Sequence, residues 1–324
     1  MDLRQMLANA AASPPSAPAT PSVGYPTNGN PGTGTPPGQP GAYWFHQIAE
    51  ELRAVVIAGG LTPDHTTLTQ VRDALYALLD AGPTRYINGL EIANGTDANN
   101  DIDIAAGVCR AATSRVALTL GATLTKQLDA AWAAGDDAGG LFSGSKAINT
   151  WYHVFLIRKD ADGTIDAGFD TAIDATNRPV GYSDYRRIMS IRTDGSGNIR
   201  RFKQAGDRVW WTAEIVESTA LPSVLTLLTV TIPPAVRSLA ICSGLIGVDN
   251  AEGADLVIAH PDLTGEHIVL RAAMSSGAGK ITAGTQFLAP SNLVSQIKYR
   301  WNQTGTLSDQ SLSVVGWIED RRNS

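Results

Sequence analysis

Three aspartates close together in the sequence could hold a calcium ion, because Ca²⁺ takes carboxylate oxygens as ligands. Asp160, Asp162 and Asp166 surround Gly163 and so resemble the start of a calcium-binding loop. The glycine comes too early for that loop, and no glutamate stands at its twelfth position. A hairpin turn explains the same residues, and a similar turn is indicated at 193–198 (TDGSGN). We therefore predict no bound metal.

Groups for nucleophilic or acid–base catalysis are present but form no familiar arrangement. The five histidines are scattered, with no pair at metal-ligand spacing on one predicted helix. The sequence contains no Gly-x-Ser-x-Gly elbow, and Gly279-Lys280 is followed by Ile281 instead of the serine or threonine of a phosphate-binding loop. Carboxylates for glycan hydrolysis are available, but their separation in space is not a property of the sequence. We predict a protein that is not an enzyme and needs no cofactor, with a glycan depolymerase or deacetylase as the alternative.

An exposed aromatic ring flanked by hydrogen-bonding groups is typical of a carbohydrate site, because sugar rings offer apolar C–H faces. Tyr299 and Trp301 alternate on one face of a predicted strand, and Asn302 lies on the other face. These three are candidate receptor-binding residues, together with polar residues of adjacent loops, namely His260, Asp262 and His267. Packing of Tyr299 and Trp301 in the core is the competing interpretation.

The composition excludes several classes of protein. Of the 324 residues, 43% are hydrophobic and 17% charged, which is enough for one or two folded domains. The net charge of -6 argues against nucleic acid as a partner. No run of about 18 apolar residues is present for insertion into a membrane. Cys109 and Cys242 lie far apart in the sequence, so we expect reduced cysteines and no disulfide framework.

The first 41 residues differ from the rest of the chain. Nine of the 17 prolines fall within the first forty residues, and no Asp, Glu, Lys or Arg occurs between Arg4 and Glu50. Proline fixes φ and removes a backbone donor, while glycine, serine and threonine bury little surface. Residues 1–41 are therefore predicted to form an extended arm. It is either a disordered linker or a segment that becomes ordered along a partner.

Residues 42–84 are predicted to form two helices. Gly59-Gly60 ends the first helix, and Thr66 or Thr67 caps the second. Apolar residues recur at helical spacing in both, at Trp44, Ile48, Leu52 and Val55 in the first and at Leu68, Val71, Leu75 and Leu78 in the second. A helix of about fourteen residues is marginal alone. Its apolar stripe must pack on the first helix, on a β domain or on copies of itself.

Beyond Arg85 the apolar residues recur with a period of two, which is typical of strands. Residues 85–219 are predicted to form a central β domain, in which residues 151–159 (WYHVFLIRK) are a strand buried on both faces. Residues 220–324 contain six further strand candidates and are predicted to form an antiparallel sandwich or jelly-roll-like module. The fold class is thus mainly β, with an extended N-terminal arm and a short α-helical section.

Two stretches of the chain resemble bacteriophage tail fibre and tail-tip receptor-binding proteins. GNPGTGTPPGQPGAYWFHQIAEELRAVVIAGGLTPDHTTLTQVRDAL is similar to their N-terminal attachment region, with a Pro/Gly-rich arm, an aromatic-started helix with an EEL core, a GLTP turn and an LTQ helix. The segments WYHVFLIRKDADGTIDAGFDT, NRPVGYSDYRRIMSIRTDGSGNI and GDRVWW are similar to the β domain that follows in many of these proteins. Together the stretches cover residues 28–211, and the C-terminal hundred residues match no motif.

The resemblance implies a virion structural protein that forms a homotrimer. Its N-terminal portion would attach to tail-tip or baseplate proteins, and residues 220–324 would form a receptor-binding domain for the host bacterial surface. The receptor would be lipopolysaccharide, capsule or pilus, and linked copies would strengthen a weak single-site contact. Synthesis and assembly would take place in the host cytoplasm. A baseplate structural connector without receptor contact is a further alternative.

Overall fold

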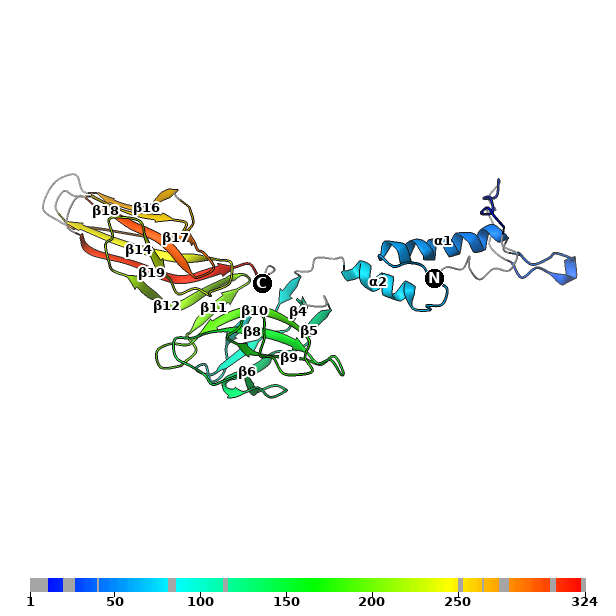
Figure 1. Cartoon of the computed structure of the whole chain (residues 1–324), viewed down its shortest axis with the longest axis horizontal. Helices are drawn as coiled ribbons and strands as arrows, with labels where there is room; N and C mark the ends of the chain where they lie inside the picture. Colours follow the sequence, from blue (N-terminus) through cyan, green and yellow to red (C-terminus); the bar gives the residue numbers. More distant parts are fainter. Residues whose placement is uncertain are drawn as a thin grey trace. The chain divides into compact units, whose positions relative to one another are not determined.

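A computed structural model describes residues 11–19, 27–39, 41–80, 86–112, 116–249, 253–263, 265–273, 280–303 and 307–321 (Figure 1). The chain is mainly β with a short N-terminal helical section, as the sequence predicts. It divides into two compact units, residues 1–84 and 85–324. Each unit is described by itself.

The described part of the N-terminal arm is mostly exposed and contains one tight turn. Pro31–Thr33 form a short 3-10 helix, and the Asn30 side chain accepts a hydrogen bond from the Gly32 N–H at 3.0 Å. Gly34 ends the turn in the left-handed region, with φ of 68°, which suits a residue without a Cβ. Asn30 and Thr35 then pair as an isolated β-bridge. This stretch of the arm therefore folds back on itself instead of remaining fully extended.

Two helices, α1 (Ala42–Ala58) and α2 (Gln70–Asp80), pack on each other through their small and branched residues. Val56 of α1 and Ala74 of α2 are fully buried. A Cβ added at Gly59 would lie 2.6 Å from the Ala74 Cα, so this close approach requires glycine. The structure thus shows the second helix packed against the first, one of the arrangements that the sequence left open.

The second helix begins later than predicted. The Asp64 carboxylate accepts hydrogen bonds from the hydroxyls of Thr66 and Thr67, at 2.8 and 3.1 Å, and so draws both threonines into a turn. Gln70 stabilises the same turn by accepting from the Asp64 N–H and donating to the Thr62 carbonyl. Leu68 consequently lies outside α2 with 87% of its surface exposed. Its predicted place in the second helix is wrong, while its predicted packing between copies of the chain stays a prediction.

The second unit begins with a three-stranded and a seven-stranded sheet. The three-stranded sheet has the order β1 (Ile87–Gly89), β4 (Gly107–Arg110) and β5 (Ala117–Leu120). The seven-stranded sheet has the order β10 (Asp184–Arg192), β8 (Trp151–Arg158), β9 (Ile165–Asp170), β7 (Ala138–Leu141), β6 (Leu124–Ala131), β3 (Asp101–Ile104) and β2 (Ile92–Asn94). Six consecutive side chains of β8, residues 152–157, are buried, which confirms the prediction of a strand covered on both faces.

The remaining strands form an antiparallel β-sandwich, consistent with the predicted fold class. One sheet has the order β11 (Phe202–Ala205), β12 (Arg208–Ser218), β19 (Leu307–Glu319), β14 (Ser238–Asp249) and β17 (Lys280–Pro290). The other has the order β13 (Thr226–Thr229), β18 (Gln296–Gln303), β15 (Gly253–Ala259) and β16 (Glu266–Ala273). Their inner faces share one core, in which Gly244 of β14 approaches Leu256 of β15 so closely that an added Cβ would lie 2.8 Å from it.

The sandwich and the seven-stranded sheet are joined by buried contacts. Strands β11 and β12 belong to the five-stranded sheet although they precede the predicted domain boundary at 219/220. Trp151, Trp211 and Trp317 form a ring cluster with centroids 5.0 to 6.0 Å apart. Beside it, Arg187 of β10 forms a buried ion pair with Glu319 of β19. Most buried apolar residues described in this unit therefore belong to one hydrophobic core, and a smaller cluster contains Phe155, Ile157, Ala175 and Tyr182.

Candidate functional site

The two aromatic residues predicted to contact a receptor lie inside the sandwich. Tyr299 and Trp301 do share one face of β18, but that face is the inner one, and they are 3% and 2% exposed. The Tyr299 hydroxyl is hydrogen-bonded to the Ser218 hydroxyl at 2.8 Å. Burial of large apolar rings stabilises the core. A receptor-binding role for these two rings is therefore wrong, and the core-packing interpretation describes them.

The other predicted receptor residues are accessible but do not converge. His267 is exposed on β16, and Asp262 is exposed in the β15–β16 connection, where its N–H donates to Nδ1 of half-buried His260 at 3.1 Å. Asn302 is exposed on β18, where it pairs with Asp255 of β15. His260 follows β15 at the opposite end, about 16 Å away at ~3.3 Å per residue. The structure therefore separates Asn302 from the histidine-bearing end of the sheet.

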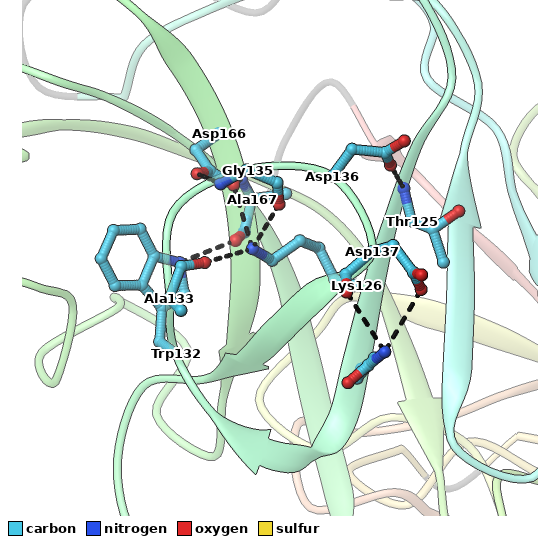
Figure 2. Close-up of polar contacts among 10 residues, drawn as sticks. Thr125, Lys126, Trp132, Ala133, Gly135, Asp136, Asp137, Asp166 and Ala167 are labelled. Atoms are coloured by element: carbon cyan, nitrogen blue, oxygen red, sulfur yellow. Dashed lines mark hydrogen bonds and ion pairs between the residues drawn. The ribbon is translucent and has the colours of Figure 1, made fainter.

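A buried lysine that the sequence did not single out is held by several polar contacts (Figure 2). Lys126 of β6 is fully buried, and its Nζ lies 3.3 Å from Asp166 Oδ1. Nζ also donates to the carbonyls of Ala133 and Gly135, at 2.6 and 3.0 Å. Asp166 in turn accepts the N–H groups of Gly135 and Ala167. The pair therefore anchors the connection between β6 and β7.

The environment of Lys126 makes it a structural cation. Burial lowers the pKa of Lys126, and the negative charge of Asp166 raises it in opposition. The Trp132 ring lies 5.6 Å from Nζ and provides a cation–π contact. All three ammonium donors have acceptors. A sequence signal existed, since the period of two places Lys126 on the same inward face as Leu124 and Leu128.

A first surface pocket lies on the outer face of the five-stranded sheet. Its volume is about 380 Å³, and four adjacent strands contribute to its walls, which include Glu214, Ser243, Leu245, Gln286 and Ser311. Apart from Leu245, the side chains are short or polar. This pocket can therefore accept a ligand that forms hydrogen bonds, with one carboxylate in its wall.

A second pocket, of about 240 Å³, lies beside Trp211 and is more positively charged. Its walls come from the turn between β10 and β11, from Asn99 between β2 and β3, and from residues 211–213 of β12. Arg201 donates to Asn99 Oδ1 at 3.1 Å and so links two of these segments. The sequence indicated only a turn here, because the pocket combines residues more than a hundred positions apart.

Neither a metal site nor a membrane helix is found in the described part of the chain. No group of three or more His, Cys, Asp or Glu side chains there is placed to hold a metal ion. None of the described helices is both long and apolar enough to cross a bilayer.

Comparison with known proteins adds little to these observations. No family model and no curated protein matches the chain. Two solved structures of viral particles each align over 72% of it. The first is the infectious bursal disease virus VP2 subviral particle, with 13% identity, 70% of that chain covered and a TM-score of 0.16. The second is infectious bursal virus derived T=1 particles, with 12% identity, 68% of that chain covered and a TM-score of 0.15. Similarity at this level supports no conclusion about fold or function.

Proposed function

We propose that the protein is a bacteriophage tail fibre or tail-tip receptor-binding protein. It acts by adhesion and not by catalysis: the N-terminal unit attaches to the tail tip or baseplate of the virion, and the β unit binds a receptor on the host surface. The resemblance of residues 28–211 to such proteins supports the proposal. The structural observation that carries it is the apolar surface left uncovered on the two helices.

This apolar surface is large for such a small helical unit. On α1, the exposed residues are concentrated in the first turns, where Trp44 is 51% and Phe45 59% exposed and their rings meet edge to face at 5.4 Å. The further large apolar residues exposed on the two helices are Ile48, Ile57, Leu75, Tyr76 and Leu78, while Leu52, Val55 and Val71 are half-buried. Exposed large apolar side chains in this number on a small unit are typical of a protein–protein contact.

Copies of the same chain suit this surface as partners. Equivalent apolar faces can cover one another around a symmetry axis, and a homotrimer would bury all of them alike. The arm that precedes α1 carries no Asp, Glu, Lys or Arg after Arg4. It can therefore lie against a neighbouring protein without the cost of removing charges from water. Self-association by the helices and attachment by the arm would then involve adjacent parts of one unit.

Native mass measurement tests the assembly directly. We expect the full chain to be a trimer and the double variant Trp44→Ser/Ile48→Ser to dissociate, because the change removes apolar surface between copies. Both side chains are already exposed within one chain, so the fold of each copy should be unaffected. Val180→Ser is the matched control, since Val180 is fully exposed in the β unit and its replacement should leave the trimer intact. A monomeric wild-type chain at micromolar concentration would contradict the proposal.

Two further measurements separate attachment from the alternatives. Phage particles whose protein lacks residues 1–41 should fail to incorporate it, and normal incorporation would refute the anchoring role of the arm. Particles that incorporate the protein but adsorb normally to host cells when its β unit is blocked by an antibody would indicate a structural connector. Release of oligosaccharide or acetate from host polysaccharide by the purified protein would contradict the non-enzymatic assignment.

A further inference from the structure

The pocket beside Trp211 has the size and the walls of a site for a small ligand. Its volume of about 240 Å³ lies just below the range of ~300–1,000 Å³ that is usual for drug-sized ligands. It has room for one sugar ring and not for a longer oligosaccharide. Asn99, Asn198 and Thr212 contribute amide and hydroxyl groups to the walls, and Arg200 and Arg201 contribute two cations.

Two residues that line the pocket each contain a buried donor atom without a hydrogen-bond partner among the residues that the structure describes. They are the indole Nε1 of Trp211 and the guanidinium Nε of Arg200. Trp211 is 6% exposed, because its ring is packed in the tryptophan cluster. Indole and guanidinium groups can only donate hydrogen bonds. Buried polar groups in proteins are almost always paired, so a ligand that accepts hydrogen bonds would suit these two donors. Both atoms are closed to water in this structure, so the ligand reaches them only when the side chains of the wall shift.

The charges around the pocket favour an anion. Arg200 and Arg201 line it together with Asp194, whose Oδ1 accepts the N–H groups of Ser196 and Asn198 at 2.8 and 2.9 Å. The Asp194 carboxylate is therefore already engaged by its own turn, while Arg201 uses only Nη2 in its bond to Asn99. A guanidinium fork matches the paired oxygens of a carboxylate or a phosphate.

Arg200 also interacts electrostatically with a second pair of charges, Arg192 and Glu217. Burial lowers the pKa of Arg192, and the nearby charge of Arg200 lowers it further, whereas Glu217 raises it. Burial also raises the pKa of Glu217, which the two arginines oppose. With Asp97, Asp194 and Glu217 set against Lys146, Arg192, Arg200 and Arg201, the cluster retains an excess of one positive charge. An incoming anion would offset the repulsion between Arg192 and Arg200.

We infer that this pocket binds a sugar residue carrying an anionic group. The anion contacts Arg200 and Arg201, and ring hydroxyls accept from Trp211 Nε1 and exchange hydrogen bonds with Asn198 and Thr212. A uronic acid and a phosphorylated hexose share this chemistry. The identification of the sugar as part of a host glycan rests on the proposed receptor-binding function, but the binding itself can be measured without it.

Isothermal titration of the full chain tests the inference with four probes, D-glucuronate, glucose 6-phosphate, glucose and inorganic phosphate. We expect at least one of the two anionic sugars to bind, and the comparison between them identifies the anion. Glucose and inorganic phosphate should each bind at least tenfold more weakly, because each offers half of the contacts. The inference would be overturned if glucose bound as tightly as both anionic sugars, or if neither anionic sugar bound. If inorganic phosphate bound as tightly as the anionic sugars, the pocket would be a simple anion site and the sugar part of the inference would be wrong.

Variants locate the binding in this pocket. Arg200→Gln and Trp211→Phe, which removes the N–H while keeping most of the ring, should each weaken binding about tenfold or more. Arg208→Gln is the matched control, because Arg208 is exposed on the same strand, outside the pocket wall, and loses the same charge. Thermal melting of each variant shows that it is folded. Unchanged affinity in both pocket variants would place the sugar elsewhere and overturn the inference.

Adsorption of phage particles to host cells distinguishes this inference from the function on which it rests. Particles that adsorb through a protein that binds neither anionic sugar would refute the pocket and leave the receptor-binding function standing. A protein that binds the sugar as expected while contributing nothing to adsorption would refute the receptor-binding function and leave the pocket standing.

Discussion

Replacing Lys126 with methionine tests the buried ion pair of the central sheet. Methionine keeps an unbranched side chain of similar length, so the change removes the charge with little change in volume. It deprives the Ala133 and Gly135 carbonyls of their donor and leaves the carboxylate of Asp166, 5% exposed, without its cation. Breaking a buried pair on one side costs about 3–5 kcal/mol of unfolding free energy. We expect a loss of that size for residues 85–324.

The double variant Lys126→Met/Asp166→Asn separates the charge from the hydrogen bonds. Asparagine removes the uncompensated negative charge and still offers one carbonyl oxygen to the N–H groups of Gly135 and Ala167. The double variant should therefore recover about 1–3 kcal/mol of the loss seen in Lys126→Met. Urea unfolding followed by tryptophan fluorescence measures both changes in the full chain.

An exposed ion pair of similar geometry provides the control. Lys159 Nζ lies 3.1 Å from Asp162 Oδ2, but these side chains are 44% and 50% exposed. Exposed pairs contribute little because water and salt screen them, so Lys159→Met should leave the urea midpoint unchanged. If Lys126→Met were as mild as Lys159→Met, or if the double variant lost at least as much stability as Lys126→Met alone, Lys126 and Asp166 would not be a coupled buried pair.

Three further changes have outcomes set by the structure. Burial lowers the pKa of His153 to about 3, whereas the pKa of histidine in the unfolded chain is about 6.5. As the pH falls, the unfolded chain therefore takes up the proton first, and the free energy of unfolding falls by about 1.4 kcal/mol per pH unit below pH 6.5. Urea titrations should find this slope reduced in His153→Asn. Gly316→Ala places a Cβ 2.0 Å from the Val209 carbonyl oxygen and should cost about 1–3 kcal/mol by thermal melting, while Gly284→Ala, with 3.5 Å to its nearest atom, should be tolerated. Leu68→Ser should leave the melting temperature unchanged, because 87% of that residue's surface is exposed within one chain.

The strands could be predicted where apolar periodicity and burial agree. Residues 151–159 and the RVWW segment have the composition of buried strands, and β8 and β12 occupy them. The start of α2 could not be predicted, because Thr66 and Thr67 serve equally well in a helix cap or in a turn. Asp64 decides between the two by accepting both hydroxyls. The hydrogen bonds to Asp64 thus outweigh the tendency of these threonines to cap a helix.

The candidate sites were harder to predict because they depend on tertiary packing. Alternation places Tyr299 and Trp301 on one face of β18, but whether that face is covered depends on the sheet that contains β14, far from β18 in the sequence. The pocket beside Trp211 joins Asn99 to residues of β12. Only Lys126 carried a usable signal, since it replaces an apolar residue in an inward-facing pattern.

The central place of β19 in its sheet bears on how the protein emerges from the ribosome. β12 pairs with β11 on one side and with β19 on the other, and β14 also requires β19. At ~5–20 residues per second, the nascent chain presents the unpaired edge of β12 for roughly 5 to 20 s before residues 307–319 are translated. During this interval the unpaired edge of β12 is open to aggregation or to capture by a chaperone.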